Sequence, residues 1–202
     1  MIEPLTAQQL RALAVMAGVV DSSFYLAGGV AVAMHLRHRV SHDLDLFSPT
    51  TDASTLADRL VQSARDTRIL TRSAGTLHAE VEGVPVSALR YAYPSLDEPS
   101  HVGLAIPVAS LHDLIAMKLS AIGGRGAARD FWDLHAMLAS RQMSLTAALD
   151  DFGRKYVQED VGHVVRALVY FADADAAPLP RGLDDAHWAR IKEDLRERVR
   201  VI

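Results

Sequence analysis

The chain has 202 residues, half of them hydrophobic, and a formal net charge of -4 at pH 7. This composition excludes a disordered chain and suits one large domain, or a mid-sized domain with a helical extension. The acidic balance argues against a broad, non-specific grip on nucleic acid, and the lack of cysteine excludes disulfides and thiolate metal sites.

The sequence shows neither a secretory signal nor a membrane span. Its first residues, Met1-Ile2-Glu3-Pro4, lack the basic and apolar regions of a signal peptide. Apolar runs stay well below the roughly 20 residues that a transmembrane helix needs. We therefore expect a soluble, cytoplasmic protein with no membrane partner.

The first half of the chain alternates between helical and extended patterns. Amphipathic spacing predicts a helix over residues 6–17, with Thr6 as its N-cap. The apolar strand 24–27 ends at a predicted turn, and residues 30–36 are predicted as a helix. Further predicted elements are the strand 43–47, the helix 52–64, and the strands 67–71, 76–82 and 84–91, with a hairpin turn at Glu82-Gly83.

After a loop with three prolines over residues 93–107, the second half is predicted to be helical. Ser110 and Asp113 resemble a capping box that opens a helix over residues 111–122, and the glycines at 123, 124 and 126 are predicted to end it. The other predicted helices cover residues 129–138, 144–152, 158–171 and 185–200, with a linker over 174–182. Strands first and helices later predict an α+β fold with a mixed sheet and a helical C-terminal half.

A glycine pair followed by an acidic pair is the strongest chemical signal. Gly28-Gly29 end a predicted strand, and after thirteen intervening residues come Asp43 and Asp45, in a pattern typical of a strand. Acids at positions i and i+2 of a strand face the same side, where their oxygens can share Mg²⁺. Adjacent glycines let backbone N–H groups approach a phosphate near a helix N-terminus. Together these residues predict a site for a nucleoside triphosphate (NTP) with its magnesium ion.

The segment between the two pairs carries groups that suit phosphate. Arg37, Arg39 and Ser41 can each donate hydrogen bonds to phosphate oxygens. We predict that Arg39 and Ser41 belong to the nucleotide-binding site with Gly28 and Gly29.

These motifs resemble those of a known family. The stretches LAGGVA at 26–31 and RVSHDLDLF at 39–47 look like the first motif of the AbiEii/AbiGii toxin family of nucleotidyltransferases. The resemblance continues at AMKLSAI, residues 116–122, and at RGAARDFWDL, residues 125–134. It spans the chain from about residue 24 to residue 138, and more loosely to the C-terminus.

The resemblance implies a DNA polymerase β-like nucleotidyltransferase fold and the transfer of nucleotides from NTP with Mg²⁺. It implies a restraining antitoxin partner, and an RNA acceptor that is tRNA in some members. Residues 1–107 are then expected to form the nucleotidyltransferase core, and residues 108–202 a helical region that completes the active-site cleft. A cell that expresses the protein alone is expected to grow slowly.

The second motif adds a lysine and an acid. Lys118 falls within the apolar stripe of the predicted helix 111–122, where a lysine either snorkels outward or is held by an anion. The family motif favours a contact with the triphosphate, and the resemblance assigns a catalytic role to Asp130. Asp133, four residues after Arg129, is expected to be structural. The candidate contacts to phosphate or RNA are Arg125, Arg129, Arg154 and Lys155.

The pattern departs from many nucleotidyltransferases at one position. A third metal-binding acid is expected on a later strand, but Ser87 occupies the obvious place. Glu80 and Glu82, on the preceding strand, are possible substitutes. Without a third acid, either Asp130 serves as the base or the site binds one metal only.

Four alternatives remain open on the sequence alone. One is a catalytically inactive nucleotide-binding module of the same fold. A second is an HD-type metal phosphohydrolase built on His35, His38 and the pair His42-Asp43. A third is an aspartyl-nucleophile phosphatase, which the polar residues before Asp43 disfavour. The last is a non-enzymatic interaction module.

Overall fold

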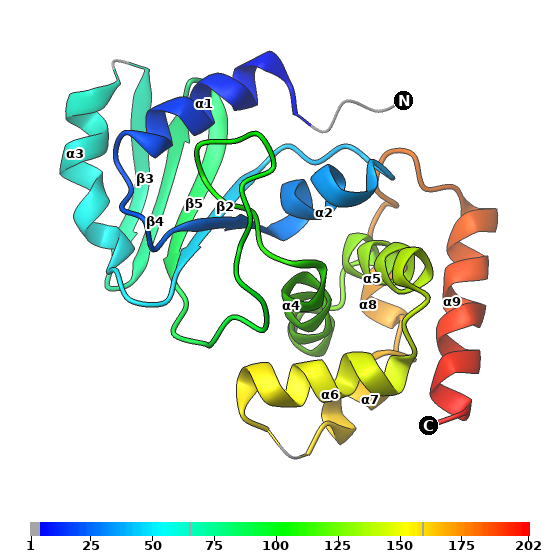
Figure 1. Ribbon diagram of the computed structural model, residues 1–202. Helices are drawn as coiled ribbons and strands as arrows, with labels where there is room; N and C mark the ends of the chain where they lie inside the picture. Colours follow the sequence, from blue (N-terminus) through cyan, green and yellow to red (C-terminus); the bar gives the residue numbers. More distant parts are fainter. Residues whose placement is uncertain (1–4, 65, 159) are drawn as a thin grey trace. The chain divides into compact units, whose positions relative to one another are not determined.

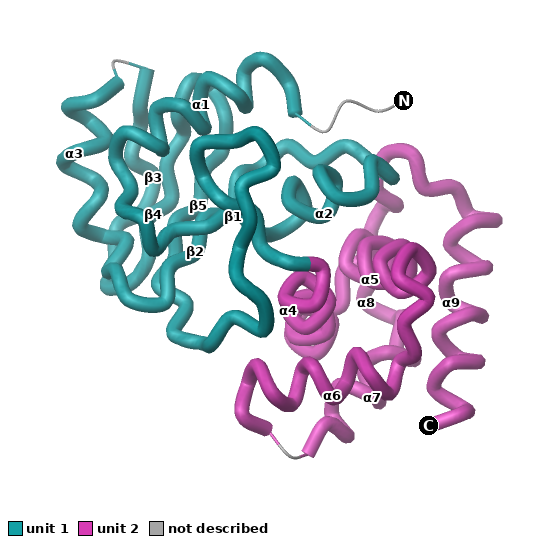
Figure 2. Tube along the Cα trace, viewed as in Figure 1, with its two compact units in different colours: residues 1–110 teal, residues 111–202 magenta. Residues whose placement is uncertain are grey.

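The structure is a computed structural model that describes residues 5–64, 66–158 and 160–202. Residues 1–4, from which we inferred the absence of a signal peptide, lie outside this described part. The chain forms two compact units, Met1–Ser110 and Leu111–Ile202 (Figure 2). In the described part of the chain, no helix is both long and apolar enough to cross a membrane.

Among the described residues, five strands form one mixed sheet in the first unit (Figure 1). Its neighbours β2 and β5 run parallel, and all other neighbouring strands are antiparallel. A parallel pair needs a crossover connection, and the chain between β2 and β5 supplies it. In spatial order the strands are β1 (Tyr25–Ala27), β2 (Leu44–Ser48), β5 (Val84–Arg90), β4 (Thr76–Val81) and β3 (Thr67–Ser73).

The three inner strands have one buried face and one partly exposed face. Leu46 on β2, Ala88 on β5 and Leu77 on β4 are at most 1% exposed. Along each of these strands, buried residues alternate with residues that are half-buried or exposed. Such alternation is expected when one face of a sheet packs on the core and the other stays open to ligands or solvent.

Three helices of the first unit pack against this sheet or one another. α1 (Ala7–Ala17) packs against α3 (Leu56–Ser63) and β5, and α2 (Gly28–Leu36) packs against β1 and β2. The prediction of Thr6 as N-cap is confirmed: its hydroxyl accepts from the backbone N–H of Gln9, whose side chain accepts in turn from the N–H of Thr6. An N-cap of this kind stabilises a helix by about 1 kcal/mol.

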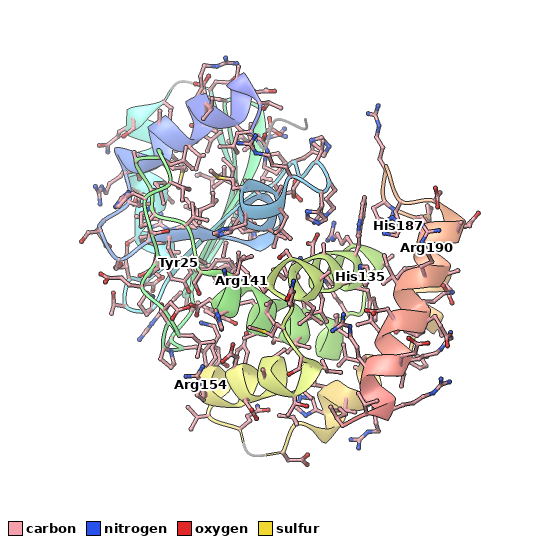
Figure 3. The ribbon with its side chains drawn as sticks, turned by 45° about the vertical axis from the view of Figure 1, so that its right-hand side comes forward. Tyr25, His135, Arg141, Arg154, His187 and Arg190 are labelled. Atoms are coloured by element: carbon pink, nitrogen blue, oxygen red, sulfur yellow. The ribbon has the colours of Figure 1, made fainter. Side chains whose placement is uncertain are left out.

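The second unit consists of helices. Its core includes Phe131, Phe171 and Trp188, whose ring centroids lie 5.1 to 5.8 Å apart. His135 of α5 and His187 of α9 lie 6.3 Å apart between ring centroids (Figure 3). The helices are α4 (Leu111–Gly124), α5 (Ala128–Arg141), α6 (Leu145–Tyr156), α7 (Gly162–Ala167), α8 (Ala172–Asp175) and α9 (Asp185–Arg200).

In the helical half of the chain, two predictions differ most from the structure. The single helix predicted over 158–171 is wrong, because α7 ends at Ala167 and α8 starts only at Ala172. Near the start of the predicted range, the Asp160 carboxylate accepts a hydrogen bond from the N–H of Gly162. This bond forms a local turn that competes with a helix. One residue of the predicted range, Glu159, lies outside the described part. The predicted break near residue 123 is also misplaced, because α4 continues through Gly124.

Candidate active site

Gly28 brings the backbone of α2 against the Asp45 side chain. Ala27, the last residue of β1, lies opposite Asp45 on β2. Gly28 follows with φ +65°, and a Cβ atom added there would overlap the Asp45 carboxylate. The predicted turn at Gly28-Gly29 is therefore corrected: α2 begins at Gly28 itself, so both glycines form the first helical residues.

Replacing Gly28 with alanine is expected to lower the free energy of unfolding by about 2 kcal/mol or more, because a side chain is disfavoured at this φ and would also displace Asp45. The matched control is Gly18→Ala, since Gly18 has φ -77° and a Cβ atom there would make only an ordinary van der Waals contact, 3.5 Å from the carbonyl oxygen of Val15. Urea denaturation of both variants checks this. Equal stability of the two variants would contradict the close approach.

Gly29 lies against two of the predicted phosphate-binding residues. A Cβ atom at Gly29 would come within 2.5 Å of the Ser41 hydroxyl and 2.8 Å of Arg39 Nη2. Arg39 is 8% exposed, and its guanidinium also donates to the carbonyl of Val40 at 3.0 Å. The structure thus gathers Gly28, Gly29, Arg39 and Ser41 at one helix N-terminus, a place that suits an anion.

The sequence interpretation missed the residue that holds this segment in place. Gln9 Nε2 on α1 donates to the carbonyls of Ser41 at 2.9 Å and His42 at 3.1 Å. Its side-chain oxygen is already used in the helix cap, so both ends of the amide are occupied. A glutamine near the start of a helix looks like a capping residue only, and the sequence carries no signal of its second role.

The two predicted metal ligands differ in their setting. Asp45 lies within β2 and is half-buried, whereas Asp43 is exposed and immediately precedes the strand, which begins at Leu44. The predicted strand over 43–47 is therefore shifted by one residue. Asp43 and Asp45 remain predicted metal ligands. Asp43 immediately precedes β2, and Asp45 is its second residue.

A row of polar side chains crosses the sheet from Asp45. Asp45 pairs with Ser87 on β5, and Ser87 pairs with His78 on β4. Paired residues of neighbouring strands project from the same face of the sheet. His78 Nδ1 and the Ser87 hydroxyl form a hydrogen bond of 3.0 Å. Sequence reasoning identified Ser87 but missed His78, although the alternation along β4 places it on this face.

The two glutamates considered as substitutes lie elsewhere. Glu80 pairs in register with Pro85 and forms an ion pair of 3.1 Å with Arg68. Glu82 is not in β4: it has φ +52° and, with Gly83 at φ +72°, makes the hairpin turn, as predicted. Neither carboxylate occupies the place beside Asp45.

Magnesium with a nucleotide fits this set of residues. No group of three or more His, Cys, Asp or Glu side chains in the described residues could hold a metal ion alone. Mg²⁺ is commonly held by one or two carboxylates plus substrate phosphates, which suits an acidic pair beside an anion-binding helix terminus. The HD-type alternative loses support, because His35 Nε2 bonds to the carbonyl of Ala109 at 2.9 Å.

The second motif forms a buried charge cluster in the helical unit. Lys118 Nζ lies 2.9 Å from Asp130 Oδ1 and 2.7 Å from Asp133 Oδ2, with Lys118 7% exposed and both acids fully buried. Arg125 donates to both oxygens of Asp130, at 2.8 and 2.9 Å. Asp133 therefore pairs with Lys118, whereas Arg129, its expected partner, is exposed. The anions that hold Lys118 in this structure are the two carboxylates.

This cluster controls the titration of Asp130. Burial alone would raise the pKa of Asp130, but the hydrogen bonds from Arg125 and the charge of Lys118 outweigh it and lower the pKa below 3.8. The carboxylate therefore contributes stability that is fully present above its unfolded pKa and is lost as the pH falls through its folded pKa.

Below about pH 5, the free energy of unfolding of the wild type is expected to fall more steeply than that of Asp130→Asn, because the amide does not titrate. Urea denaturation from pH 7 down to pH 3 measures both slopes. Parallel curves for the two proteins would contradict the lowered pKa.

One predicted RNA contact is wrong. Lys155 is fully buried and forms an ion pair of 2.6 Å with Asp113, so it cannot reach a polynucleotide. Asp113, predicted as part of a helix cap, is the buried partner in this pair. Arg154 is exposed, and its guanidinium pairs with Asp151.

The sheet topology and the glycine–aspartate site define a class of protein. A mixed sheet that presents an Asp-x-Asp pair beside a helix N-terminus is the architecture of DNA polymerase β-like nucleotidyltransferases, as predicted. The nucleotidyltransferase toxin MenT4 of Mycobacterium tuberculosis H37Rv has a similar fold. The two chains are 16% identical, the match covers 96% of this chain and 81% of that chain, and the TM-score is 0.61. The antibiotic-resistance factor ANT(2'')-Ia is similar at 12% identity, with 74% of this chain and 91% of that chain covered and a TM-score of 0.55.

The chain belongs to the AbiEii family of nucleotidyl transferase toxins of type IV toxin–antitoxin systems, whose model matches residues 68–200. This confirms the family resemblance. The chain is also 30% identical over 189 residues to the uncharacterized protein aq_aa25 of Aquifex aeolicus, covering 89% of this chain and 87% of that protein. The glycine pair and the acidic pair precede the matched range, so the site residues rest on their own geometry.

Proposed function

We propose that this protein transfers a nucleotide from NTP to an RNA acceptor, tRNA, with Mg²⁺, and that an antitoxin restrains it. The observation that carries the proposal is the close approach of Gly28 to the Asp45 carboxylate, with Arg39 and Ser41 against Gly29. This arrangement brings a carboxylate and several hydrogen-bond donors to one helix N-terminus, which supports a site for a cation and phosphate there. The nucleotidyltransferase family and its toxin–antitoxin context support the same activity.

In the proposed reaction a hydroxyl oxygen of the RNA forms a bond to the α-phosphorus of the NTP. The bond from that phosphorus to the bridging oxygen breaks, pyrophosphate leaves, and the hydroxyl proton passes to water. Mg²⁺, when bound, neutralises phosphate charge and acts as a Lewis acid.

The protein's own residues bind and orient the nucleotide in this proposal. Asp43 and Asp45 would hold the cation. Arg39, Ser41 and the first N–H groups of α2 would donate to phosphate oxygens, which fixes the triphosphate before reaction. Lys118 and Asp130 stay predicted contributors to catalysis.

The acceptor is proposed to bind through few charges. A net charge of -4 leaves no excess of cations for a broad contact. The exposed arginines at 125 and 129 are the proposed contacts to RNA. Binding should therefore depend only modestly on salt, in proportion to the few phosphates that these side chains neutralise.

The experiment incubates the protein with each α-labelled NTP in turn, Mg²⁺, and either total cellular RNA or duplex DNA. We expect one NTP to label an RNA species of tRNA size. Equal labelling of duplex DNA would contradict an RNA acceptor. Growth of cells that express the protein with and without the neighbouring gene tests the antitoxin, and harmless strong expression would contradict a toxin.

A catalytically inactive nucleotide-binding module is the second candidate function. One observation favours it: Ser87 stands beside Asp45 where many nucleotidyltransferases place a third acid. Binding of an NTP without incorporation into any RNA would support this module over the enzyme.

A further inference from the structure

On the partly exposed face of the sheet, the position beside Asp45 carries no charge, although a second divalent cation there would need a negatively charged ligand. Ser87 is the register neighbour of Asp45 on the parallel strand β5. Paired positions of neighbouring strands project side by side, so an acid at 87 could share cations with Asp45. In two-metal sites the ions lie about 3.5–4 Å apart and need several carboxylates between them. A hydroxyl brings no negative charge to this place.

The Ser87 hydroxyl already has a partner within the sheet. His78 is in register with Ser87 on β4, and its Nδ1 lies 3.0 Å from the Ser87 oxygen. Both side chains are half-buried, which shields their hydrogen bond from water. A hydroxyl engaged with a histidine is a poor substitute for a carboxylate ligand of a hard cation.

No other described carboxylate on the strands of the first unit replaces the missing acid. Glu80 projects from the same face, but it lies beside Pro85 and its charge is paired with Arg68 at 3.1 Å. Glu82 lies in the hairpin turn, and Asp43 precedes β2. Within the described residues, no three potential ligands gather at one point.

We propose that this sheet face holds one divalent cation with each bound nucleotide, and that Ser87, engaged by His78, is the residue that sets this number. The inference rests on the proposed function, because Asp43, Asp45 and the triphosphate must hold the first cation. The RNA hydroxyl is then not activated by a second metal, and the place of that metal is taken by the hydrogen-bonded pair Ser87 and His78.

The test counts Mn²⁺ bound per chain by equilibrium dialysis, at saturating concentrations of a non-hydrolysable NTP analogue. After subtraction of the Mn²⁺ carried by unbound analogue, the wild type and Ser87→Ala are expected to bind one Mn²⁺ per bound analogue, and Ser87→Asp to bind two. In Ser87→Asp, two ions about 4 Å apart should show spin coupling in the electron paramagnetic resonance spectrum. The matched control is Thr71→Asp, which adds an acid beyond His78 in the same row and should leave the count at one.

Each outcome is decisive, and the wild-type count does not depend on how any variant folds. Two Mn²⁺ ions in the wild type would overturn the inference and leave the proposed transfer intact. One ion in a folded Ser87→Asp protein would show that Ser87 does not set the number. No bound Mn²⁺ in the wild type would overturn the metal–nucleotide site and, with it, this inference.

Discussion

Replacing Asp45 with asparagine is expected to slow nucleotide transfer by about a thousandfold or more, since the loss of metal-assisted charge stabilisation costs several kcal/mol of activation free energy. The amide keeps the size of the side chain but loses the charge that we propose holds the cation. Asp45 lies on the partly exposed face of β2, so the fold should survive. Asp43→Asn is expected to act in the same direction. Initial rates with saturating NTP and RNA measure both effects.

The matched control for these variants is Asp58→Asn. Asp58 is an exposed acid of the same unit, paired with Arg72 at 3.1 Å. Its removal changes the net charge by the same amount and should leave the rate within about twofold of the wild type, because exposed ion pairs contribute little. A wild-type rate in both Asp43→Asn and Asp45→Asn would contradict the assignment of the acidic pair.

Replacing Lys118 with alanine is expected to lower the free energy of unfolding by about 3–5 kcal/mol, because it strips two fully buried carboxylates of their shared ammonium. Lys118→Arg should recover only part of this loss. A planar guanidinium is larger than an ammonium and demands a different donor geometry, and Lys118 is 7% exposed, with little room for either. Urea denaturation at pH 7 gives the three unfolding free energies.

Lys192→Ala is the matched lysine control in the same helical unit. Lys192 pairs at 2.9 Å with Asp175, whose carboxylate is more exposed. Lys192→Ala should therefore lower the free energy of unfolding by only about 1 kcal/mol. If Lys118→Ala costs no more than Lys192→Ala, the buried cluster is not a structural element. If Lys118→Arg matches the wild type in stability and transfer, Lys118 acts only as a generic cation.

The same experiment clarifies the role of Lys118 in catalysis. The sequence predicted a contact between this lysine and the triphosphate, whereas in the structure Lys118 pairs with Asp130 and Asp133. A slow Lys118→Ala enzyme could therefore reflect a damaged fold. Only a variant that keeps its stability and still loses transfer would assign Lys118 to the chemistry.

The sequence predicted the strands well because their signal is local. Alternation along residues 76–81 and 84–90, with Glu82-Gly83 between them, identified a hairpin whose turn needs positive φ at both residues. The helix at 185–200 matched α9, because Asp184 caps it and an apolar stripe runs along it.

The parts that failed depend on contacts between distant residues. The buried pair Lys155–Asp113 joins residues 42 positions apart, so Lys155 looked like a surface cation in the sequence. Gln9 holds the segment before β2 from 32 positions away, and no local pattern reports such a bond. His78 became part of the site only once the register of β4 and β5 was known.

The candidate site was predicted in its composition but not in its geometry. Gly28, Gly29, Arg39, Ser41 and Asp45 were chosen for their chemistry. The sequence could not reveal that Gly28 touches the Asp45 carboxylate, because this contact needs β1 and β2 in register. The register of β2 and β5 shows why position 87 matters, since it places Ser87 next to Asp45.

The most direct test of nucleotidyl transfer follows two labels through one reaction. Purified protein is incubated with cellular RNA, Mg²⁺ and the preferred NTP, labelled at the α-phosphate in one sample and at the γ-phosphate in the other. We predict that the α-label enters RNA, that the γ-label appears in pyrophosphate, and that both signals disappear in Asp45→Asn. Entry of the γ-label into RNA, or α-labelled RNA at the wild-type level in Asp45→Asn, would contradict nucleotidyl transfer at this site.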